Sequence, residues 1–402
     1  MRFGTPLLRA GLTMAGLTLC APALMAAGQY DGGASDTEIV IGNIVPYSGP
    51  LSGAGAIGTC HQAYFERVNK AGGINGRKVR VVSLDDGFNP ARTLEQARRL
   101  VERENALLIY GTFGTATNTA IHHYLNQKQV PQLFIVSGAS KWNDPKQFPW
   151  TIGFLPSYAV EATGYARHVL DHVKDAKVAV LYENDDYGKE YRNAFRAALG
   201  PQADRLIVAE QSYEVTDPTI DAQVSRLKAS GANVLLNVTA AKFAAQAVKL
   251  VNDSGWKPTH FLVNPASNLQ TVIRPAGMEA SQGIISAQFM KDPTSPAFQN
   301  DPDVKAWREW KAAYNPRAAE GDWWNWHCYA TSYTLEQVLK RAGDDLRRAN
   351  VMKVATGLKD LKVPMLLDGI TVNTSSGDYA AIKQMQLMRL AGEGFELYNP
   401  NK

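Results

Sequence analysis

The sequence is poor in cysteine and has no long run of one kind of charge. Its 402 residues include three cysteines, and 42 Lys and Arg nearly balance 38 Asp and Glu, which gives a net charge of +4. Such a balanced chain lacks the electrostatic pattern of nucleic-acid-binding proteins. After residue 27 it also lacks an apolar stretch long enough to span a bilayer. With 45% hydrophobic and 20% charged residues, it has the composition of a soluble globular protein.

Motifs that carry catalytic or metal chemistry are also missing. The chain has no G-x-S-x-G and no H-E-x-x-H, and its Gly-containing segment 45–55 lacks the order of a phosphate-binding loop. His168 and His172 have a spacing that zinc can use, but without a third ligand a solvated helix face is the better interpretation. The acids at 85–86 and 184–186 follow predicted strands, where capping of a helix is their commoner role. The sequence therefore predicts no catalytic site, no metal and no cofactor.

The N-terminal residues are expected to form a cleaved signal peptide. Arg2 and Arg9 flank a short apolar stretch that leads to a run of small residues, a pattern typical of secretory signals. Removal of residues 1–27 would leave Cys60 and Cys328 in an exported protein. Two cysteines in an oxidising compartment can pair, and at this point a disulfide and two buried thiols both remain open.

The rest of the chain alternates between predicted strands and predicted helices. Strands are expected at 38–44, 78–84, 107–110, 132–136, 177–182, 205–211, 233–238, 261–263 and 283–289. Helices are expected at 57–71, 90–103, 115–127, 157–173, 187–199, 218–229 and 240–253, and then over much of 302–357, before strand-like pieces near 368–373 and 381–390. This order predicts parallel sheets covered by helices on both faces, and the length favours two such units.

Two uncharged loops follow neighbouring predicted strands. Phe113, Gly114 and Thr115 stand between one strand and a helix, and the segment 137–140 ends the next strand. Backbone N–H groups and the helix dipole at such a place favour an anion, and Thr hydroxyls add donors. A plain helix cap remains the alternative for the first loop. Because ligands of open α/β sheets bind beyond the carboxyl ends of the strands, the two loops together favour a binding site.

Several motifs resemble those of one protein family. They are the predicted signal peptide, Glu38-Ile39-Val40-Ile41-Gly42, Ser48-Gly49-Pro50, Ala71-Gly72-Gly73-Ile74-Asn75-Gly76-Arg77, Asp85-Asp86 and Tyr187-Gly188. Over about residues 38–398 the chain is similar to the periplasmic substrate-binding proteins of branched-chain amino-acid-type ABC transporters. The resemblance implies an α/β fold of two Rossmann-like lobes with parallel sheets, joined by three crossovers, known as the type I periplasmic binding protein.

The same resemblance implies a domain division and a set of partners. The N-terminal lobe would contain 38–153 and 289–365, and the C-terminal lobe 154–288 and 366–402, which puts both remaining cysteines in one lobe. The protein would be a periplasmic monomer without enzymatic activity that binds a small carboxylate and meets a membrane permease. No nucleic acid is expected.

The resemblance also implies which residues meet the ligand. In the family's amino-acid binders, small-residue loops hold the carboxylate, and the matching residues here are Gly114, Thr115, Gly138, Ala139 and Ser140. An acid from the second lobe normally holds the ammonium group. Here Ala266 stands at about that place, beside Asn264, and Thr239 replaces a usual aromatic. Since an unpaired ammonium in a closed cleft is costly, an α-amino acid is disfavoured.

Aromatic residues crowd the remaining candidate positions. The expected contacts also include Ser48 and the rings of Tyr47, Phe88, Phe113, Trp142, Tyr158, Tyr187 and Phe289. Part of this set is expected to be ordinary core. A flat apolar carboxylate would use both the rings and the neutral loops, and the chain resembles the subgroup that includes binders of phenylpropanoids and benzoates. An aromatic-acid carrier is the preferred prediction, and an amino-acid carrier, a ligand-sensing regulator or ectodomain of the same fold, and an exported enzyme are the alternatives.

Overall fold

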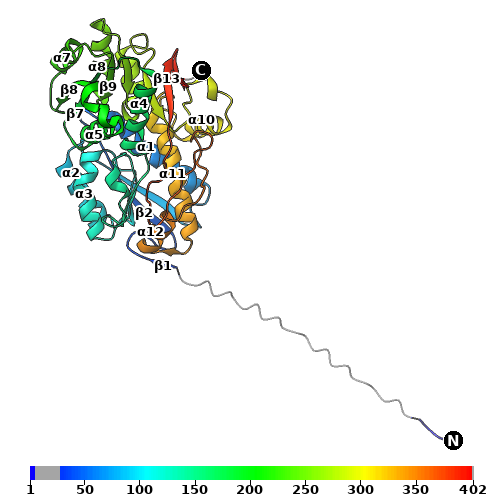
Figure 1. Ribbon diagram of the computed structural model, residues 1–402. Helices are drawn as coiled ribbons and strands as arrows, with labels where there is room; N and C mark the ends of the chain where they lie inside the picture. Colours follow the sequence, from blue (N-terminus) through cyan, green and yellow to red (C-terminus); the bar gives the residue numbers. More distant parts are fainter. Residues whose placement is uncertain (5–27, 401–402) are drawn as a thin grey trace.

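The chain folds into two α/β lobes that lie one above the other (Figure 1). The computed structural model describes residues 1–4 and 28–400, so most of the predicted signal peptide lies outside the described residues. Each lobe has its own sheet and its own hydrophobic core. The predicted α/β architecture with two parallel-sheet units is therefore confirmed.

The first lobe is built on a parallel five-stranded sheet in the order β3-β2-β4-β5-β6. Its strands are β2 (Glu38–Val45), β3 (Lys78–Asp85), β4 (Leu108–Tyr110), β5 (Gln132–Ile135) and β6 (Thr151–Gly153). The helices between them are α1 (Ala56–Lys70), α2 (Pro90–Glu102) and α3 (Thr115–Gln127). Local chemistry explains their starts: the Asn89 side chain accepts from the N–H groups of Ala91 and Arg92, and Pro90 follows it at the first position of α2.

The second lobe is built on a seven-stranded sheet in the order β14-β13-β11-β10-β9-β7-β8. Its strands are β7 (Val178–Glu183), β8 (Ile207–Tyr213), β9 (Val234–Val238), β10 (Thr259–Leu262), β11 (Ile285–Gln288), β13 (Gln386–Ala391) and β14 (Gly394–Leu397). The helices of this lobe are α4 (Tyr158–His172), α5 (Asp186–Leu199), α6 (Ala203–Leu206), α7 (Asp221–Ala229), α8 (Ala241–Asp253) and α9 (Arg274–Ala276). The last two strands run antiparallel and close one edge.

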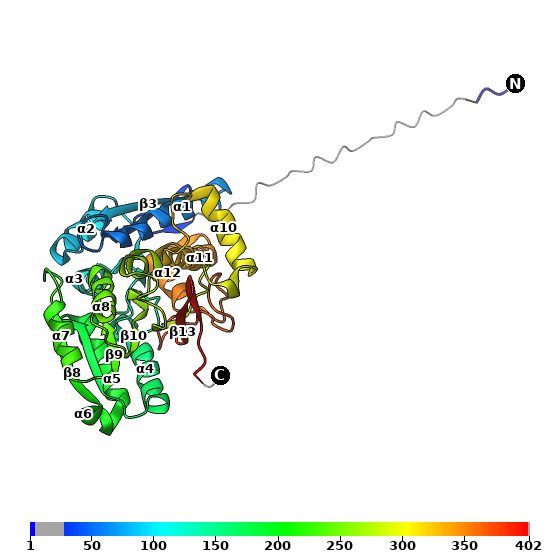
Figure 2. The ribbon, with the colours of Figure 1, turned by 90° about the horizontal axis from the view of Figure 1, so that it is seen from above.

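Three late helices return to the first lobe. They are α10 (Pro302–Tyr314), α11 (Trp323–Ala342) and α12 (Arg348–Ala355), and they belong to the core of the first sheet. In the view from above, α1, α10 and α11 lie together (Figure 2). A disulfide joins Cys60 of α1 to Cys328 of α11, so the pairing that the sequence left open is present in the structure.

The return to the second lobe comes later than the sequence predicted. No strand forms at 368–373, where Leu361 and Val372 make only an isolated bridge. The apolar residues from Leu361 to Ile382 pack in the core of the first lobe, because their side chains find partners there, and the chain enters the second sheet only at β13. The expected division at 365/366 therefore differs from the observed packing, and the predicted strand at 381–390 begins at Gln386 and is followed by a hairpin.

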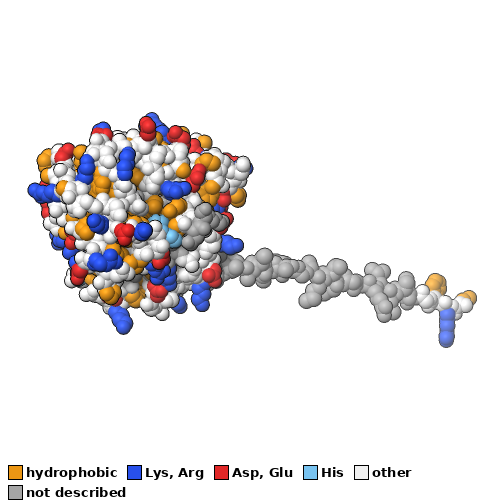
Figure 3. Space-filling view, turned by 45° about the horizontal axis from the view of Figure 1, so that its top comes forward, with side chains coloured by type: hydrophobic (Ala, Val, Ile, Leu, Met, Phe, Trp, Pro, Cys, Tyr) orange, Lys and Arg blue, Asp and Glu red, His pale blue; other side chains and the backbone are white. Residues whose placement is uncertain are grey.

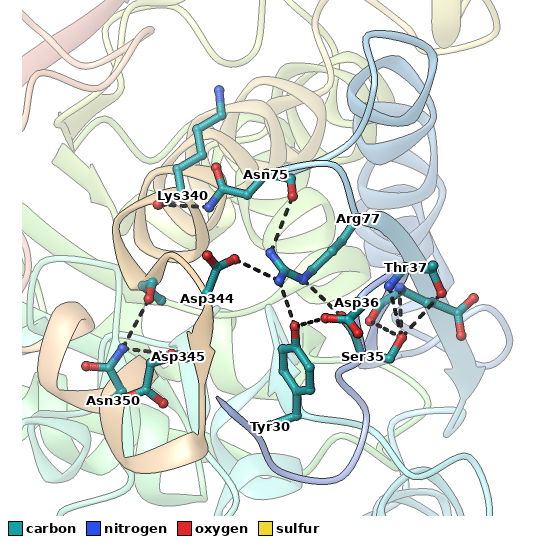
Figure 4. A network of polar contacts seen from close by, with 12 residues as sticks. Tyr30, Ser35, Asp36, Thr37, Asn75, Arg77, Lys340, Asp344, Asp345 and Asn350 are labelled. Carbon is teal, nitrogen blue, oxygen red and sulfur yellow. Dashed lines mark hydrogen bonds and ion pairs between the residues drawn. The ribbon is translucent and has the colours of Figure 1, made fainter. Parts of the chain in front are cut away.

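The N-terminal segment is fastened to the first lobe at the end opposite the second lobe. There β1 (Gln29–Tyr30) pairs with β12 (Asp345–Leu346), at the bottom of the view in Figure 1. The guanidinium of Arg77 donates to the Tyr30 hydroxyl at 2.7 Å, to Asp344 at 2.8 Å and to the Ser35 carbonyl at 2.9 Å (Figure 4). The Arg of the Gly-Gly-Ile-Asn-Gly-Arg motif thus anchors this segment.

Two histidines of the first lobe, His61 and His327, are completely buried, and His327 makes the stability sensitive to acid. The His327 ring stacks on Trp323 with ring centroids 4.6 Å apart, and neither of its ring nitrogens has a hydrogen-bond partner among the described residues. Burial lowers the pKa of His327 to about 3, so the ring is neutral in the folded protein. As the pH falls below about 6.5, the imidazole of His327 takes up a proton in the unfolded chain but not in the folded protein. The free energy of unfolding is therefore highest above that pH and decreases on acidification.

A phenylalanine at this position should remove that acid sensitivity. His327→Phe keeps a stacked ring but cannot take up a proton, so we expect its loss of unfolding free energy between pH 7 and pH 5 to be smaller than that of the unchanged protein by about 2 kcal/mol. Urea unfolding at the two pH values measures this difference. His172→Phe, at an exposed position on α4, is the control and should lose as much unfolding free energy as the unchanged protein. If His327→Phe loses the same amount, His327 is not the source of the acid sensitivity.

Candidate functional site

A cavity of about 530 Å³ lies between the lobes, at the carboxyl ends of both sheets. This volume is within the range of about 300–1,000 Å³ that small-molecule sites occupy. Both lobes contribute to its lining, which is mostly apolar: Leu51, Phe88, Phe113 and Trp324 come from the first lobe, and Tyr158, Tyr187, Pro265 and Val272 come from the second. The cavity is thus a cleft whose walls can approach one another if the lobes move.

The N-terminus of α3 opens into this cavity. Gly114 and Thr115 line it, and no side chain caps this helix end. Gly114 has φ +96° and ψ 155°, and a Cβ there would stand 2.5 Å from the Phe88 ring and 2.7 Å from the Thr117 hydroxyl. Only glycine adopts this conformation readily, and it brings the free N–H groups of the first turn to the cavity wall. Such a helix end favours a bound anion.

Hydroxyl groups surround the same helix end. The Thr115 Oγ1 shares hydrogen bonds with the Ser137 hydroxyl at 2.8 Å and with the Tyr158 hydroxyl at 3.1 Å. Both partners are buried, and Tyr158 comes from the second lobe. The hydroxyls of this group can reorient their protons toward an incoming carboxylate. A cluster of hydroxyls thus lies beside uncapped N–H groups at the first predicted loop, and its role as a carboxylate cradle remains a prediction.

Aromatic rings form the walls next to this cradle. Phe113 lies edge to face with Trp324 at 5.2 Å and tilted to Phe88 at 5.8 Å. On the other lobe Tyr158 and Tyr187 meet edge to face at 5.2 Å. Trp324 lies in the first turn of α11, and its place in the cavity depends on how that helix packs. A flat apolar ligand would find ring partners on both lobes.

The second lobe also brings carboxyl groups to the cavity, contrary to the expectation from Ala266. Glu183 is the last residue of β7, Asp185 follows the strand, and both line the cavity. Asp185 caps α5 by accepting from the Gly188 N–H at 3.0 Å. Glu183 is only 4% exposed, and its Oε2 accepts from the Tyr213 hydroxyl at 2.6 Å. Burial, followed by the charge of Asp185, raises the pKa of Glu183 to about 8, so this carboxyl holds its proton at neutral pH.

Comparison with known proteins decides the family. The family described as periplasmic binding protein matches residues 38–394. The chain is a type I periplasmic binding protein. It is similar to the Leu/Ile/Val-binding protein homolog 1 of Brucella abortus (strain 2308), with 25% identity over 348 residues that cover 85% of this chain and 88% of the relative. The predicted family is confirmed.

Solved structures share the fold of this periplasmic binding protein. A branched chain amino acid ABC transporter protein from Thermus thermophilus with bound valine superposes with a TM-score of 0.81 at 17% identity, covering 90% of this chain and 96% of that one. A fatty acid ABC transporter substrate-binding protein from Thermomonospora curvata gives a TM-score of 0.77 at 19% identity, with 90% of each chain covered. At these identities the likeness establishes the fold alone.

Part of the predicted ligand set lines the cavity of the binding protein. The residues brought together there are Phe88, Phe113, Gly114, Thr115, Tyr158 and Tyr187. Their contacts with a ligand remain a prediction. The lining residues Leu51, Glu183, Lys242, Gln246 and Trp324 were not in the predicted set. Glu183 directly follows the strand predicted at 177–182, and this position was the one signal in the sequence. The others become neighbours only through the packing of α8, α11 and the first loop.

The second predicted loop, at 138–142, faces the other lobe instead of the cavity. Glu190 of α5 accepts from the Ser140 N–H at 3.0 Å and from its hydroxyl at 2.6 Å, and Lys141 pairs with Asp186 at 2.7 Å. The donors of Ser140 are therefore already engaged, and Gly138 and Ala139 do not line the cavity. Trp142 is buried and donates to the Ser137 hydroxyl at 2.9 Å, so it supports the cradle from behind.

Two further predicted residues bind the neighbouring strand. The Tyr47 hydroxyl shares a hydrogen bond with Ser83 at 2.6 Å, and the Ser48 hydroxyl donates to Asp85 at 2.7 Å. Neither residue lines the cavity, whereas Pro50 and Leu51 of the same loop do. The loop was therefore located correctly along the chain, but its cavity-facing residues lie a few positions further on.

The remaining predicted residues are buried behind the wall. Asn264 donates to the Ala287 carbonyl at 3.0 Å, Thr239 donates to Asn237 at 2.6 Å, and Ala266 is fully buried. Phe289 packs on Trp323 at 6.1 Å. In two of these loops the adjacent residue, Ala240 or Pro265, lines the cavity. The offset is a single residue, and this is enough to turn a side chain from the cavity to the core.

The remaining surface shows no strong bias of charge. On the face drawn in Figure 3, Lys and Arg are interspersed with Asp and Glu. Within residues 1–4 and 28–400, no helix is long and apolar enough to cross a membrane, and no group of three or more His, Cys, Asp or Glu is placed to hold a metal ion. The interlobe cavity is therefore the feature of the described chain that best fits ligand binding.

Proposed function

We propose that the protein is the solute-binding component of an ABC importer and that it captures a small apolar carboxylate, preferably an aromatic acid. The observation that carries this proposal is the uncapped N-terminus of α3, lined by the Thr115, Ser137 and Tyr158 hydroxyls, opening between aromatic walls. N–H groups and neutral hydroxyls can hold a carboxylate without an ion pair. The protein would act in the periplasm after export and deliver its ligand to a membrane permease.

Binding is proposed to proceed by closure of the two lobes. The chain crosses from one lobe to the other three times. The crossings lie between β6 and α4, after β11, and between Ile382 and β13. After β11 the chain is supported by the return segment, since the Lys291 N–H bonds the Met365 carbonyl at 2.8 Å and the Leu367 N–H bonds the Phe289 carbonyl at 3.0 Å. Few connections of this kind permit hinge motion. A ligand that contacts both walls shifts the equilibrium toward the closed form.

An α-amino acid is the second candidate ligand, and one observation favours it. Glu183 and Asp185 stand on the second-lobe wall, where a carboxylate could meet an ammonium group. The similar proteins of Brucella, named Leu/Ile/Val-binding protein homologues, point in the same direction. Against it, Asp185 already caps α5 and Glu183 holds its proton at neutral pH.

A ligand panel separates the two candidates. We expect cinnamate, 4-hydroxycinnamate and benzoate to raise the melting temperature more than leucine or phenylalanine, because the acids need no partner for an ammonium group. A ligand at 100 times its Kd adds about 2.7 kcal/mol to the free energy of unfolding, which makes its binding visible in this measurement. Thr115→Val, which removes one hydroxyl and keeps the shape, should weaken binding of the best acid by about ten-fold. Thr115→Ser should retain most of it.

The control is Thr119→Val. Thr119 lies one turn further along α3, outside the cavity lining, so this variant should bind the acid like the unchanged protein. Stabilisation by leucine or phenylalanine and by none of the acids would overturn the aromatic-acid proposal in favour of the amino-acid carrier.

A further inference from the structure

We propose that Glu183 is a specificity-determining residue that hydrogen-bonds a hydroxyl group of the ligand, at the end away from the ligand's carboxylate. This inference rests on the proposed function, because the carboxylate is taken to lie at the N-terminus of α3. It narrows the ligand class to hydroxy-substituted aromatic acids.

Glu183 has the burial and the unused hydrogen-bonding capacity of a ligand-contacting group. It is 4% exposed and lines the cavity. Its Oε2 accepts a hydrogen bond from the Tyr213 hydroxyl at 2.6 Å. A carboxyl group has donor and acceptor capacity beyond this one bond, so a ligand hydroxyl that reaches it can form an additional hydrogen bond in a site shielded from water.

The protonated carboxyl of Glu183 favours a hydroxyl over a cation. The charges of Asp185 and Glu214 add to burial in raising its pKa, and no Lys, Arg or His of the described chain forms an ion pair with it that would favour the ionised form. Burial raises its pKa to about 8, so at neutral pH the group can both donate and accept a hydrogen bond. A phenolic hydroxyl offers the matching donor and acceptor, whereas an ammonium group would need the ionised form.

A second group on the same lobe supports this inference. Gln246 of α8 lines the cavity, and its Oε1 is buried without a hydrogen-bond partner in the described structure. An amide oxygen accepts hydrogen bonds, so it requires a donor. The second-lobe wall therefore presents two polar groups that a ligand hydroxyl can satisfy, in a lining that is otherwise mostly apolar.

Glu183 and the carboxylate cradle are connected only through intermediate side chains. Thr115 contacts the Tyr158 hydroxyl, and the Tyr158 ring meets Tyr187. Tyr187 donates to the Thr239 carbonyl at 3.2 Å. The next residue, Ala240, donates its N–H to the Tyr213 hydroxyl at 3.0 Å, which in turn bonds Glu183. The two polar ends thus belong to different lobes, and the tyrosine rings line the path between them.

The experiment compares ligands that differ in one group. Titration calorimetry at pH 7 would measure the Kd of 4-hydroxycinnamate and of 4-methylcinnamate, which has a similar size but no hydroxyl, together with leucine and phenylalanine. We expect the unchanged protein to prefer the hydroxyl by about ten-fold. Glu183→Gln can still donate and accept, so it should keep most of this preference, whereas Glu183→Leu should reduce it to less than about three-fold.

Each outcome has a defined meaning. Glu210→Gln on the adjacent strand β8, outside the lining, is the matched control and should keep the full preference. Equal binding of the two cinnamates, or a preference that survives in Glu183→Leu, would overturn this inference and leave the proposed function standing. If neither cinnamate binds and an amino acid does, the proposed function fails as well. The ligand comparison in the unchanged protein decides the matter even if Glu183→Leu does not fold.

Discussion

Replacing Cys60 and Cys328 by alanine is expected to lower the free energy of unfolding by about 4 kcal/mol. The disulfide joins α1 to α11 across a sequence separation of 268 residues. Cross-links that close long loops restrict the unfolded chain most, although the measured gain is often below the entropic value. Both cysteines are fully buried, so the alanines also lose packing contacts in the core of the first lobe.

Urea unfolding followed by circular dichroism measures this loss. The control is the unchanged protein with its disulfide reduced, which should unfold at a urea concentration between those of the oxidised protein and the double variant, because it keeps the packing of both sulfur atoms. Ligand affinity should remain, because neither cysteine lines the cavity. A decrease of less than about 1 kcal/mol would show that the bond contributes little beyond the packing of the two helices.

The second large effect is expected at Gly114, where alanine should weaken ligand binding by about 100-fold. The φ of +96° with ψ of 155° lies in a region that residues with a side chain reach at a cost of about 1–3 kcal/mol. The added Cβ would also meet the Phe88 ring at 2.5 Å and Thr117 at 2.7 Å. The helix end must then move, and with it the N–H groups that are proposed to hold the carboxylate, where small displacements have large effects on binding.

Gly164→Ala provides a matched comparison for this substitution. Gly164 lies inside α4 with open space around its Cβ position and an ordinary φ, so alanine there should leave binding unchanged and stabilise the helix slightly. Calorimetry and thermal unfolding of the two variants separate a specific effect at the cradle from a general effect of replacing glycine. Equal affinities in the two variants would argue against the cradle.

Most strands and helices could be predicted because local signals mark their ends. The helix at 115–127 follows an apolar strand and a glycine, and the structure has it at Thr115–Gln127. The failures have a common cause in long-range packing. Residues 368–373 look strand-like in sequence, but the apolar residues Ile370 and Val372 fill the core of the first lobe. The short strand β6 is missing from the expected strands, because only its pairing with β5 makes it a strand.

The candidate site was only partly predictable for the same reason. The proposed cradle is a local strand–glycine–helix feature, and such a feature is visible in the sequence. The sequence has Ala266 at about the position of the family's acid, so no acid was expected, whereas in the structure Glu183 at the end of β7 and Asp185 after it line the cavity, because the spatial neighbours of a cavity depend on strand order. Thr239 and Ala266 were each one residue away from a lining residue, and in a loop adjacent side chains point in different directions.

The fastening of the N-terminal segment has a practical consequence for measuring this protein. Tyr30 is paired with β12 and held by Arg77 at the end of the first lobe that is remote from the second lobe. A linker placed just before Gln29 would attach the molecule to a chip by the far end of the first lobe, away from the interlobe cavity. An immobilised sensor built in this orientation could report solute concentration without obstructing the movement of the lobes.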